Sequence, residues 1–195
     1  MTESTVLETR FTEPPADAGE AEMLLFALDR SRAQFAWKAG GLDAAGLDHP
    51  HPPSALTLRN LLRHLAQVEY HKVTVFVTGD AMRYPDWPPL PEPSPPRLAV
   101  VYEDPDWAWR VPEDETPEET YRIWDTAVRY ARDAWRRAVA EGGLDQPSRY
   151  AFEDGFRPNL RRILVDLQDE YARHTGHADL IREAVDGLVG EDPPQ

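Results

Sequence analysis

Three side chains that readily bind metal ions stand near the end of the sequence: Glu170, His174 and His177. They are spaced four and then three residues apart, so on a helix they would fall within about 60° of arc on one face. A carboxylate and an imidazole one helical turn apart can bind the same divalent cation. The spacing therefore predicts a metal site with Glu170 and His174 as ligands. His177 is either a further ligand or a group that faces the same cavity.

These polar residues interrupt an apolar stripe of the same predicted helix. Steps of three or four residues lead from Leu160 and Leu167, through the polar residues, to Ile181, so the polar residues belong to the inward face. A buried carboxylate with two imidazoles would cost several kcal/mol if nothing compensated it. A shared cation is the simplest compensation.

A second predicted helix carries His64 on its apolar stripe, between Leu61 and Val68. A lone histidine on such a stripe is most often a hydrogen-bonded core residue, but opposite Glu170 and His174 it becomes the third ligand. The resulting set of two imidazoles and one carboxylate leaves coordination positions open. It suits zinc best, and nickel or iron(II) as well.

The remaining histidines are expected outside this site. His71 lies two turns past His64 and is interpreted as a polar neighbour of the core, whereas His49 and His51 stand in a proline-rich loop and are expected to be exposed. The sequence has no HExxH zinc-protease motif. It also lacks the paired Glu-x-x-His motifs of a di-iron centre. A mononuclear site is therefore the better interpretation.

Four segments with helical periodicity must position these residues. Their start and stop signals place them at about 19–38, 57–79, 116–142 and 158–187. The third opens with Thr116-Pro117-Glu118-Glu119, which is a capping box with proline at the first helical position. We therefore predict an all-α fold in the form of an antiparallel four-helix bundle.

The connection between the second and third helices, residues 80–115, is too long for a plain bundle turn. It is rich in proline and carries Trp87, Trp107 and Trp109, and such tryptophans argue against disorder. We predict an ordered loop that lies over the bundle and roofs the metal cavity. The stretch LAVVY, residues 98–102, is a weak candidate for a strand.

The composition bounds the partners and the location. The 195 residues carry a formal net charge of -14, which would be repelled by a nucleic-acid backbone or an anionic membrane. There is no membrane-spanning apolar run, no signal-peptide pattern and no cysteine, so we expect a cytoplasmic protein. We predict a single domain, 19–190, between an N-terminal segment, 1–18, and a frayed tail, 191–195.

Two of the helical segments carry a family resemblance. The stretches LLRHLAQVEYH and EYARHTGHADLIREAVDG, with GLDAAGL before the first, resemble the DinB/YfiT-like superfamily over about residues 20–190. The nearest branch holds uncharacterised actinobacterial proteins related to mycothiol-dependent maleylpyruvate isomerase. The resemblance implies a four-helix bundle and a divalent metal held by His64, Glu170 and His174. Many members have histidine in place of Glu170, and the isomerase branch has glutamate. The resemblance also places His177 in the cavity wall.

The resemblance implies an activity as well. The enzymatic members are thiol-dependent transferases or isomerases, whose metal binds a low-molecular-weight thiol and presents its thiolate to an electrophile. The absence of cysteine is compatible with a thiol that arrives as cosubstrate. His177 would then orient the substrate or shuttle a proton. The isomerase has an additional C-terminal domain, so maleylpyruvate isomerisation is not expected of a chain that ends after the bundle.

Two other functions would use the same ligands. One is a non-catalytic metal-binding or dimerising protein, and the other is a metal-assisted hydrolase with water at the open position. A homodimer is left open in each case. A basic cluster on the third helix either anchors an acidic cosubstrate or forms a solvated face beside acidic neighbours. Its members are Arg129, Arg132, Arg136 and Arg137.

Overall fold

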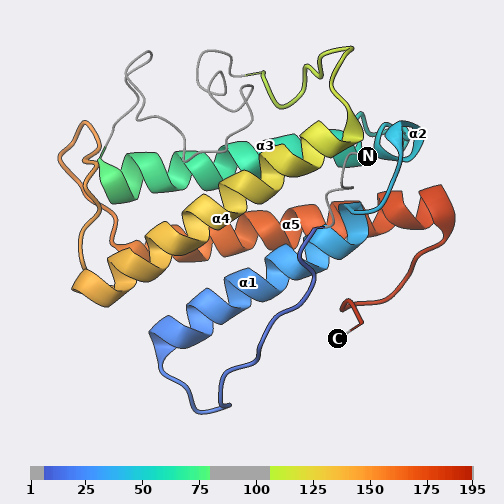
Figure 1. The fold of residues 1–195 in the computed structure, drawn as a ribbon. Helices are drawn as coiled ribbons and strands as arrows, with labels where there is room; N and C mark the ends of the chain where they lie inside the picture. Colours follow the sequence, from blue (N-terminus) through green and yellow to red (C-terminus); the bar gives the residue numbers. More distant parts are fainter. Residues whose placement is uncertain (1–6, 80–105, 195) are drawn as a thin grey trace.

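The computed structural model describes residues 7–79 and 106–194, and the regular secondary structure within these ranges is helical (Figure 1). The elements are α1 (Glu20–Ala39), α2 (Ala44–Leu47), α3 (Leu58–Lys72), the π-helix η1 (Val73–Thr78), α4 (Pro117–Gly142) and α5 (Leu160–Asp186). The predicted all-α fold is confirmed for this part of the chain. The predictions for Trp87 and for residues 98–102 lie outside the described residues.

The long helices begin where the sequence places their capping residues. Thr57 caps α3 because its side chain accepts a hydrogen bond from the backbone N–H of Asn60. Thr116 caps α4 in the same way, with Glu119 as the donor. At the start of α5 the cap is Asn159, one residue beyond the expected start of that helix. The short helix α2 is not predicted by periodicity, because a single turn carries too few residues to show it.

The last turns before the long connection are π-helical, which the sequence analysis does not predict. The hydroxyl of Thr74 donates to the backbone oxygen of Tyr70 at 2.6 Å, and that of Thr78 donates to the backbone oxygen of Thr74 at 2.8 Å. These hydroxyls compete with backbone N–H groups for the same carbonyls, which loosens the α-helical pattern. The π-helix ends at Gly79, whose φ of 78° favours glycine.

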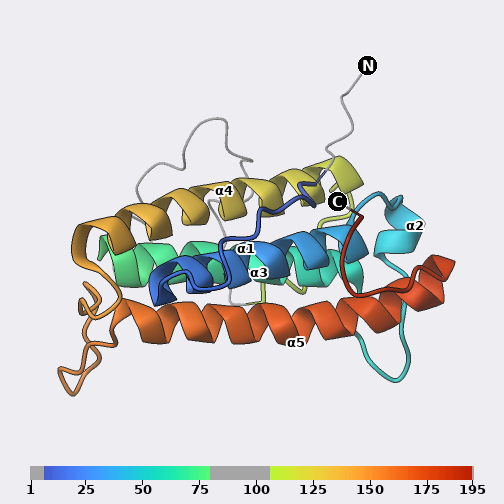
Figure 2. The same cartoon turned by 90° about the horizontal axis from the view of Figure 1, so that it is seen from below.

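The directions of the helices differ from the prediction. α3 and α4 run parallel, and so do α1 and α5 (Figures 1 and 2). Arg59 at the start of α3 donates to Thr120 at the start of α4 (2.9 Å), and Lys38 at the end of α1 pairs with Asp179 near the end of α5 (3.0 Å). A uniformly antiparallel order is therefore wrong. The physical reason is the long connection, which returns the chain to the end of the molecule where α3 begins.

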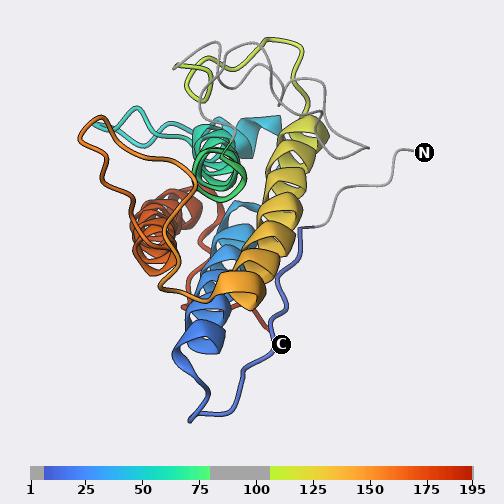
Figure 3. The ribbon, with the colours of Figure 1, turned by 90° about the vertical axis from the view of Figure 1, so that its left-hand side faces the viewer.

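The long helices enclose one hydrophobic core. Figure 3 shows α3 beside both α4 and α5, and α1 also packs against those two helices. At the centre, the ring of Phe35 on α1 lies 5.8 Å from that of Trp124 on α4 and 6.2 Å from that of Tyr171 on α5. All three side chains are buried, so three helices are tied together by one aromatic cluster.

A buried ion pair joins α1 to α3. The guanidinium of Arg32 donates to both carboxylate oxygens of Glu69, at 2.6 and 2.7 Å. Both side chains are almost completely buried, and Asp29 accepts a further bond from Arg32 at 2.9 Å. The two carboxylates raise the pKa of Arg32 in spite of its burial. The pair fixes how α1 and α3 are aligned within the core.

The end of the chain folds back onto α1. The carboxylate of Asp192 accepts hydrogen bonds from Arg30 at 2.6 Å and from Gln34 at 2.8 Å. The prediction of a frayed tail is therefore wrong as far as residue 194, because these polar contacts hold the segment on the helix. No helix in residues 7–79 or 106–194 is long and apolar enough to span a membrane.

Candidate metal centre

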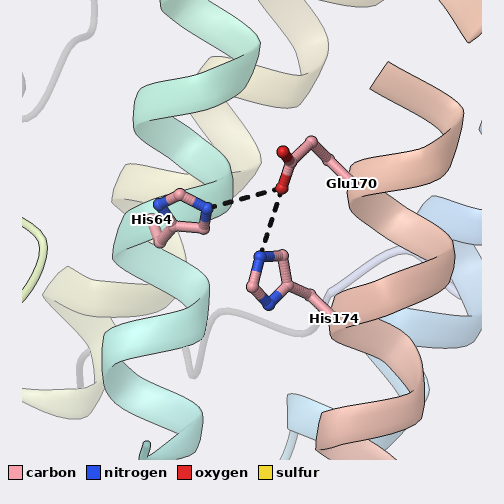
Figure 4. A group of neighbouring side chains, drawn as sticks. All are labelled: His64, Glu170 and His174. Carbon is pink, nitrogen blue, oxygen red and sulfur yellow. Dashed lines mark ion pairs between the residues drawn. The ribbon is translucent and has the colours of Figure 1, made fainter. Parts of the chain in front are cut away.

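The three predicted ligands lie together where α3 faces α5 (Figure 4). Nε2 of His64 is 3.7 Å from Oε2 of Glu170, and Nε2 of His174 is 3.2 Å from the same oxygen. The two imidazole rings meet edge to face, with their centroids 4.8 Å apart. Two helices that are remote in sequence thus direct two nitrogens and one oxygen toward a common point.

The spacing of these atoms fits a divalent ion. One ligand atom from each of the three residues lies within 4.8 Å of the other two. Ligand atoms about 2.1 Å from a tetrahedral zinc ion would be about 3.4 Å apart. The separations of 3.2 and 3.7 Å from Glu170 bracket that value. No second cluster of this kind is found among the residues that the structure describes.

Burial keeps both imidazoles of the cluster uncharged. It lowers the pKa of His174 to about 4, and the neighbouring His64 adds to this effect while Glu170 opposes it. Burial also lowers the pKa of His64, again against the attraction of Glu170. An uncharged imidazole offers the nitrogen lone pair that a metal ion requires. At neutral pH both histidines are therefore in the form that binds metal.

Two further residues of α5 contact these ligands from behind. Nδ1 of His174 lies 3.3 Å from Nδ1 of His177, and a guanidinium nitrogen of Arg173 lies 3.5 Å from Oε1 of Glu170. A proton on Nδ1 of His174 would make the first contact a hydrogen bond and leave Nε2 for a metal ion. His177 thus stands next to the cluster and is not one of its mutually close ligand atoms.

The other histidines lie away from the centre. His71 meets the ring of Phe76 edge-on at 6.2 Å, and burial lowers the pKa of His71. His49 and His51 are half-buried, so the prediction that they are exposed is wrong. The reason is a tight turn in which the backbone oxygen of His51 accepts a bond from Ser54 at 2.9 Å. None of these three joins the metal cluster.

The arginines of α4 contact carboxylates and do not belong to the metal centre. Arg132 and Arg136 both donate to Asp29 on α1, at 2.9 and 3.0 Å. Arg129 pairs with Asp125 one turn earlier on its own helix. These contacts favour the interpretation of the cluster as a solvated face beside acidic neighbours. Arg137, its fourth member, lines a cavity of about 280 Å³ near the end of η1.

The candidate metal centre is partly exposed to solvent. The side chains of His64 and Glu170 are 22% and 28% exposed. A larger cavity of about 650 Å³ lies between the N-terminal segment, α1 and α4, and none of the three cluster residues lines either cavity. The candidate centre therefore lies outside both cavities, with two of its side chains partly exposed to solvent.

A tryptophan of the long connection lies against the candidate centre. The indole of Trp109 stacks on the imidazole of His64, with centroids 5.3 Å apart and planes inclined by 24°. Of the predicted tryptophan-bearing loop, Trp109 thus lies against the candidate centre, and that the loop roofs a cavity there stays a prediction. Trp107 is buried instead and lies against the guanidinium of Arg63, 3.8 Å from its ring centroid. The sequence identifies the tryptophans. It does not identify Asn60 and Arg63 of α3, which donate to the backbone next to them.

The fold and the cluster together define the class of protein. It is a helical protein in which α3 and α5 hold a candidate mononuclear metal centre of two imidazoles and one carboxylate. The family model described as mycothiol-S-transferase matches residues 23–187, a range that includes all three cluster residues. The chain belongs to this family, which is DinB-like and related to mycothiol enzymes, so the resemblance drawn from the sequence is confirmed. Among curated proteins, none matches the sequence.

Proposed function

We propose that this protein is a metal-dependent S-transferase that joins an external thiol of the mycothiol type to an electrophile. The observation that carries the proposal is the convergence of His64, Glu170 and His174 in a chain of the mycothiol-S-transferase family. We further propose that residues 19–190 form one domain, a four-helix bundle that holds this centre. The absence of cysteine from the whole sequence supports a thiol supplied from outside and a cytoplasmic setting.

The three ligands would hold one divalent ion, most simply zinc. When bound, such an ion supplies Lewis acidity that lowers the pKa of a thiol from about 8.5 toward neutrality. The chain's own residues fix the geometry before the thiol arrives: Arg173 lies against the second oxygen of Glu170, and His177 lies against the second nitrogen of His174. His177 is thus better supported as a positioning residue than as a catalytic one.

In the transfer, one sulfur–carbon bond forms at the electrophile, and the bond from that carbon to its leaving group breaks. The leaving group departs with the electron pair and takes up the proton that the thiol has lost. Both molecules would enter through the opening where the side chains of His64 and Glu170 are partly exposed. The aromatic surface of Trp109 lies beside the same opening and would exclude water from one side of it.

Cobalt substitution tests this proposal directly. We expect the Co(II) protein to develop a near-ultraviolet charge-transfer band when mycothiol or a smaller thiol is added. The chain has no cysteine, so the band can come only from the added thiol. His64→Ala should abolish the band, and His71→Ala, as the matched control on the same helix, should preserve it. If Co(II) binds stoichiometrically and every thiol leaves its spectrum unchanged, the transferase proposal is wrong, and metal-assisted hydrolysis becomes the better one.

A further inference from the structure

The imidazole of His64 is contacted by two other rings. Trp109 stacks nearly parallel to it at 5.3 Å, and His174 meets it edge-on at 4.8 Å. The side chain of Trp109 is not part of the core, because the residue is 44% exposed. Burial alone therefore does not account for the position of this indole. Its neighbours in the chain and on α3 do.

One anchor of Trp109 comes from the helical turn that precedes His64. Nδ2 of Asn60 donates to the backbone oxygen of Ala108 at 3.1 Å. The backbone N–H of Trp109 in turn donates to Asp106 at 2.9 Å, which closes a tight turn around Ala108. The residue immediately before the tryptophan is thus tied to the same helix that supplies the metal ligand.

The second anchor is the buried guanidinium of Arg63. It donates to the backbone oxygen of Trp107 at 2.5 Å and lies 3.8 Å from the centroid of that indole. It also pairs with Glu115, and both charged side chains are completely buried. A buried, bonded arginine is a rigid support, because moving it would leave a charge without its partner. Residues 107–115 are consequently fixed to α3 at a point adjacent to His64.

We infer that Trp109 is a positioning residue of the metal centre, which fixes the ring plane of His64 and closes that side of the centre to water. The inference rests on the proposed function, since it concerns an ion held by His64. The terminal torsion of a histidine side chain is broad, so a partly exposed ligand ring needs a contact to hold its plane. Supports of metal ligands typically change metal affinity by about 10- to 100-fold when removed.

Cobalt titration of purified protein, followed by tryptophan fluorescence, tests the role of the indole. Co(II) should quench part of the wild-type emission, because Trp109 lies against a ligand of the ion. Trp109→Phe should lose that quenching yet keep the affinity within about threefold, since a phenyl ring preserves the stacking. Trp109→Ala should bind Co(II) about tenfold more weakly. The control Trp37→Phe, at an indole that packs against Gly190, should retain the quenching.

The anchor is tested by Asn60→Asp, which removes the donor to Ala108 but keeps the acceptor for Thr57. We expect this variant to bind Co(II) more weakly than the wild type and to show less quenching, with an unchanged melting temperature in the metal-free form. Equal affinity in the wild type and Trp109→Ala, with quenching retained in Trp109→Phe, would overturn the inference and leave the proposed function standing. Failure of His174→Ala to reduce Co(II) binding would overturn both.

Discussion

The second ring nitrogen of His174 faces His177, with the two Nδ1 atoms 3.3 Å apart, while the first faces the carboxylate of the cluster. The two histidines are three residues apart on α5, so their side chains lie on the same face of the helix. A ligand that is held at both ring nitrogens has a defined tautomer and a defined plane. This relationship favours the interpretation of His177 as a neighbour of the cluster over that of a further ligand.

The first prediction concerns His177. We expect His177→Ala to weaken zinc binding about tenfold, because His174 loses the partner of its Nδ1. His177→Gln should retain more affinity, since its amide oxygen can accept the same bond. Titration calorimetry with Zn(II) would measure both. Complete loss of zinc in His177→Ala would make His177 a ligand, and an unchanged affinity would show that the contact has no role in metal binding.

The second prediction concerns the ligand set. Purified wild-type protein should contain about one divalent ion per chain, as expected of a mononuclear site. His174→Ala should remove the ion. His71→Ala should retain it, because His71 lies on α3 outside the cluster. Elemental analysis after exhaustive dialysis would measure the metal content per chain of the wild type and of both variants. Retention of a full complement of metal by both variants would place the site elsewhere.

The third prediction concerns acid stability without metal. Burial lowers the pKa of His174 to about 4 from 6.5, so between these values the unfolded chain binds a proton that the folded chain does not. The free energy of unfolding should therefore be unaffected above about pH 6.5 and should fall as the pH drops toward 4, with a slope of at most about 1.4 kcal/mol per pH unit from this group.

Urea unfolding of chelator-treated protein across this range would measure the effect. In His174→Gln the free energy of unfolding should depend less on pH over this range, because glutamine does not titrate. A wild-type stability that is constant between pH 6.5 and 4, or that rises as the pH falls, would contradict the assignment of a buried, uncharged imidazole at this position.

The fourth prediction concerns the buried pair between α1 and α3. Glu69→Gln should destabilise the protein by about 3 kcal/mol, because it leaves the buried guanidinium of Arg32 with Asp29 as its remaining carboxylate. Asp166→Ala, which removes an exposed pair with Arg162, should cost less than about 1 kcal/mol. Denaturant unfolding would compare the two. Similar costs for both variants would mean that burial does not set the strength of these pairs.

Much of the fold and of the candidate centre can be predicted from the sequence, because both depend on local spacing. The capping residues Thr57 and Thr116 mark where α3 and α4 begin, and the interruption of an apolar stripe indicates the positions of Glu170 and His174. Helix direction depends instead on where a long connection returns the chain, which periodicity does not encode. For that reason the sequence does not predict the parallel pairing of α3 with α4.

The sequence does not reveal the residues that lie behind the centre, for a related reason. Asn60 and Arg63 occupy ordinary helical positions, and their role depends on residues 107–115, which approach only in the folded chain. A buried arginine cannot be distinguished by sequence from one that snorkels to the surface. The three-residue spacing of His174 and His177 was visible, but the choice between ligand and neighbour required the distances between their nitrogens.

The remoteness of His64 from Glu170 in sequence has a consequence for how the chain is held together. An ion shared by α3 and α5 would act as a reversible cross-link between distant parts of a polypeptide that has no cysteine and therefore no disulfide. Because His64 and Glu170 meet only in the folded chain, the ion would stabilise the folded state by mass action. Removing the ion with a chelator should therefore lower the melting temperature of the protein.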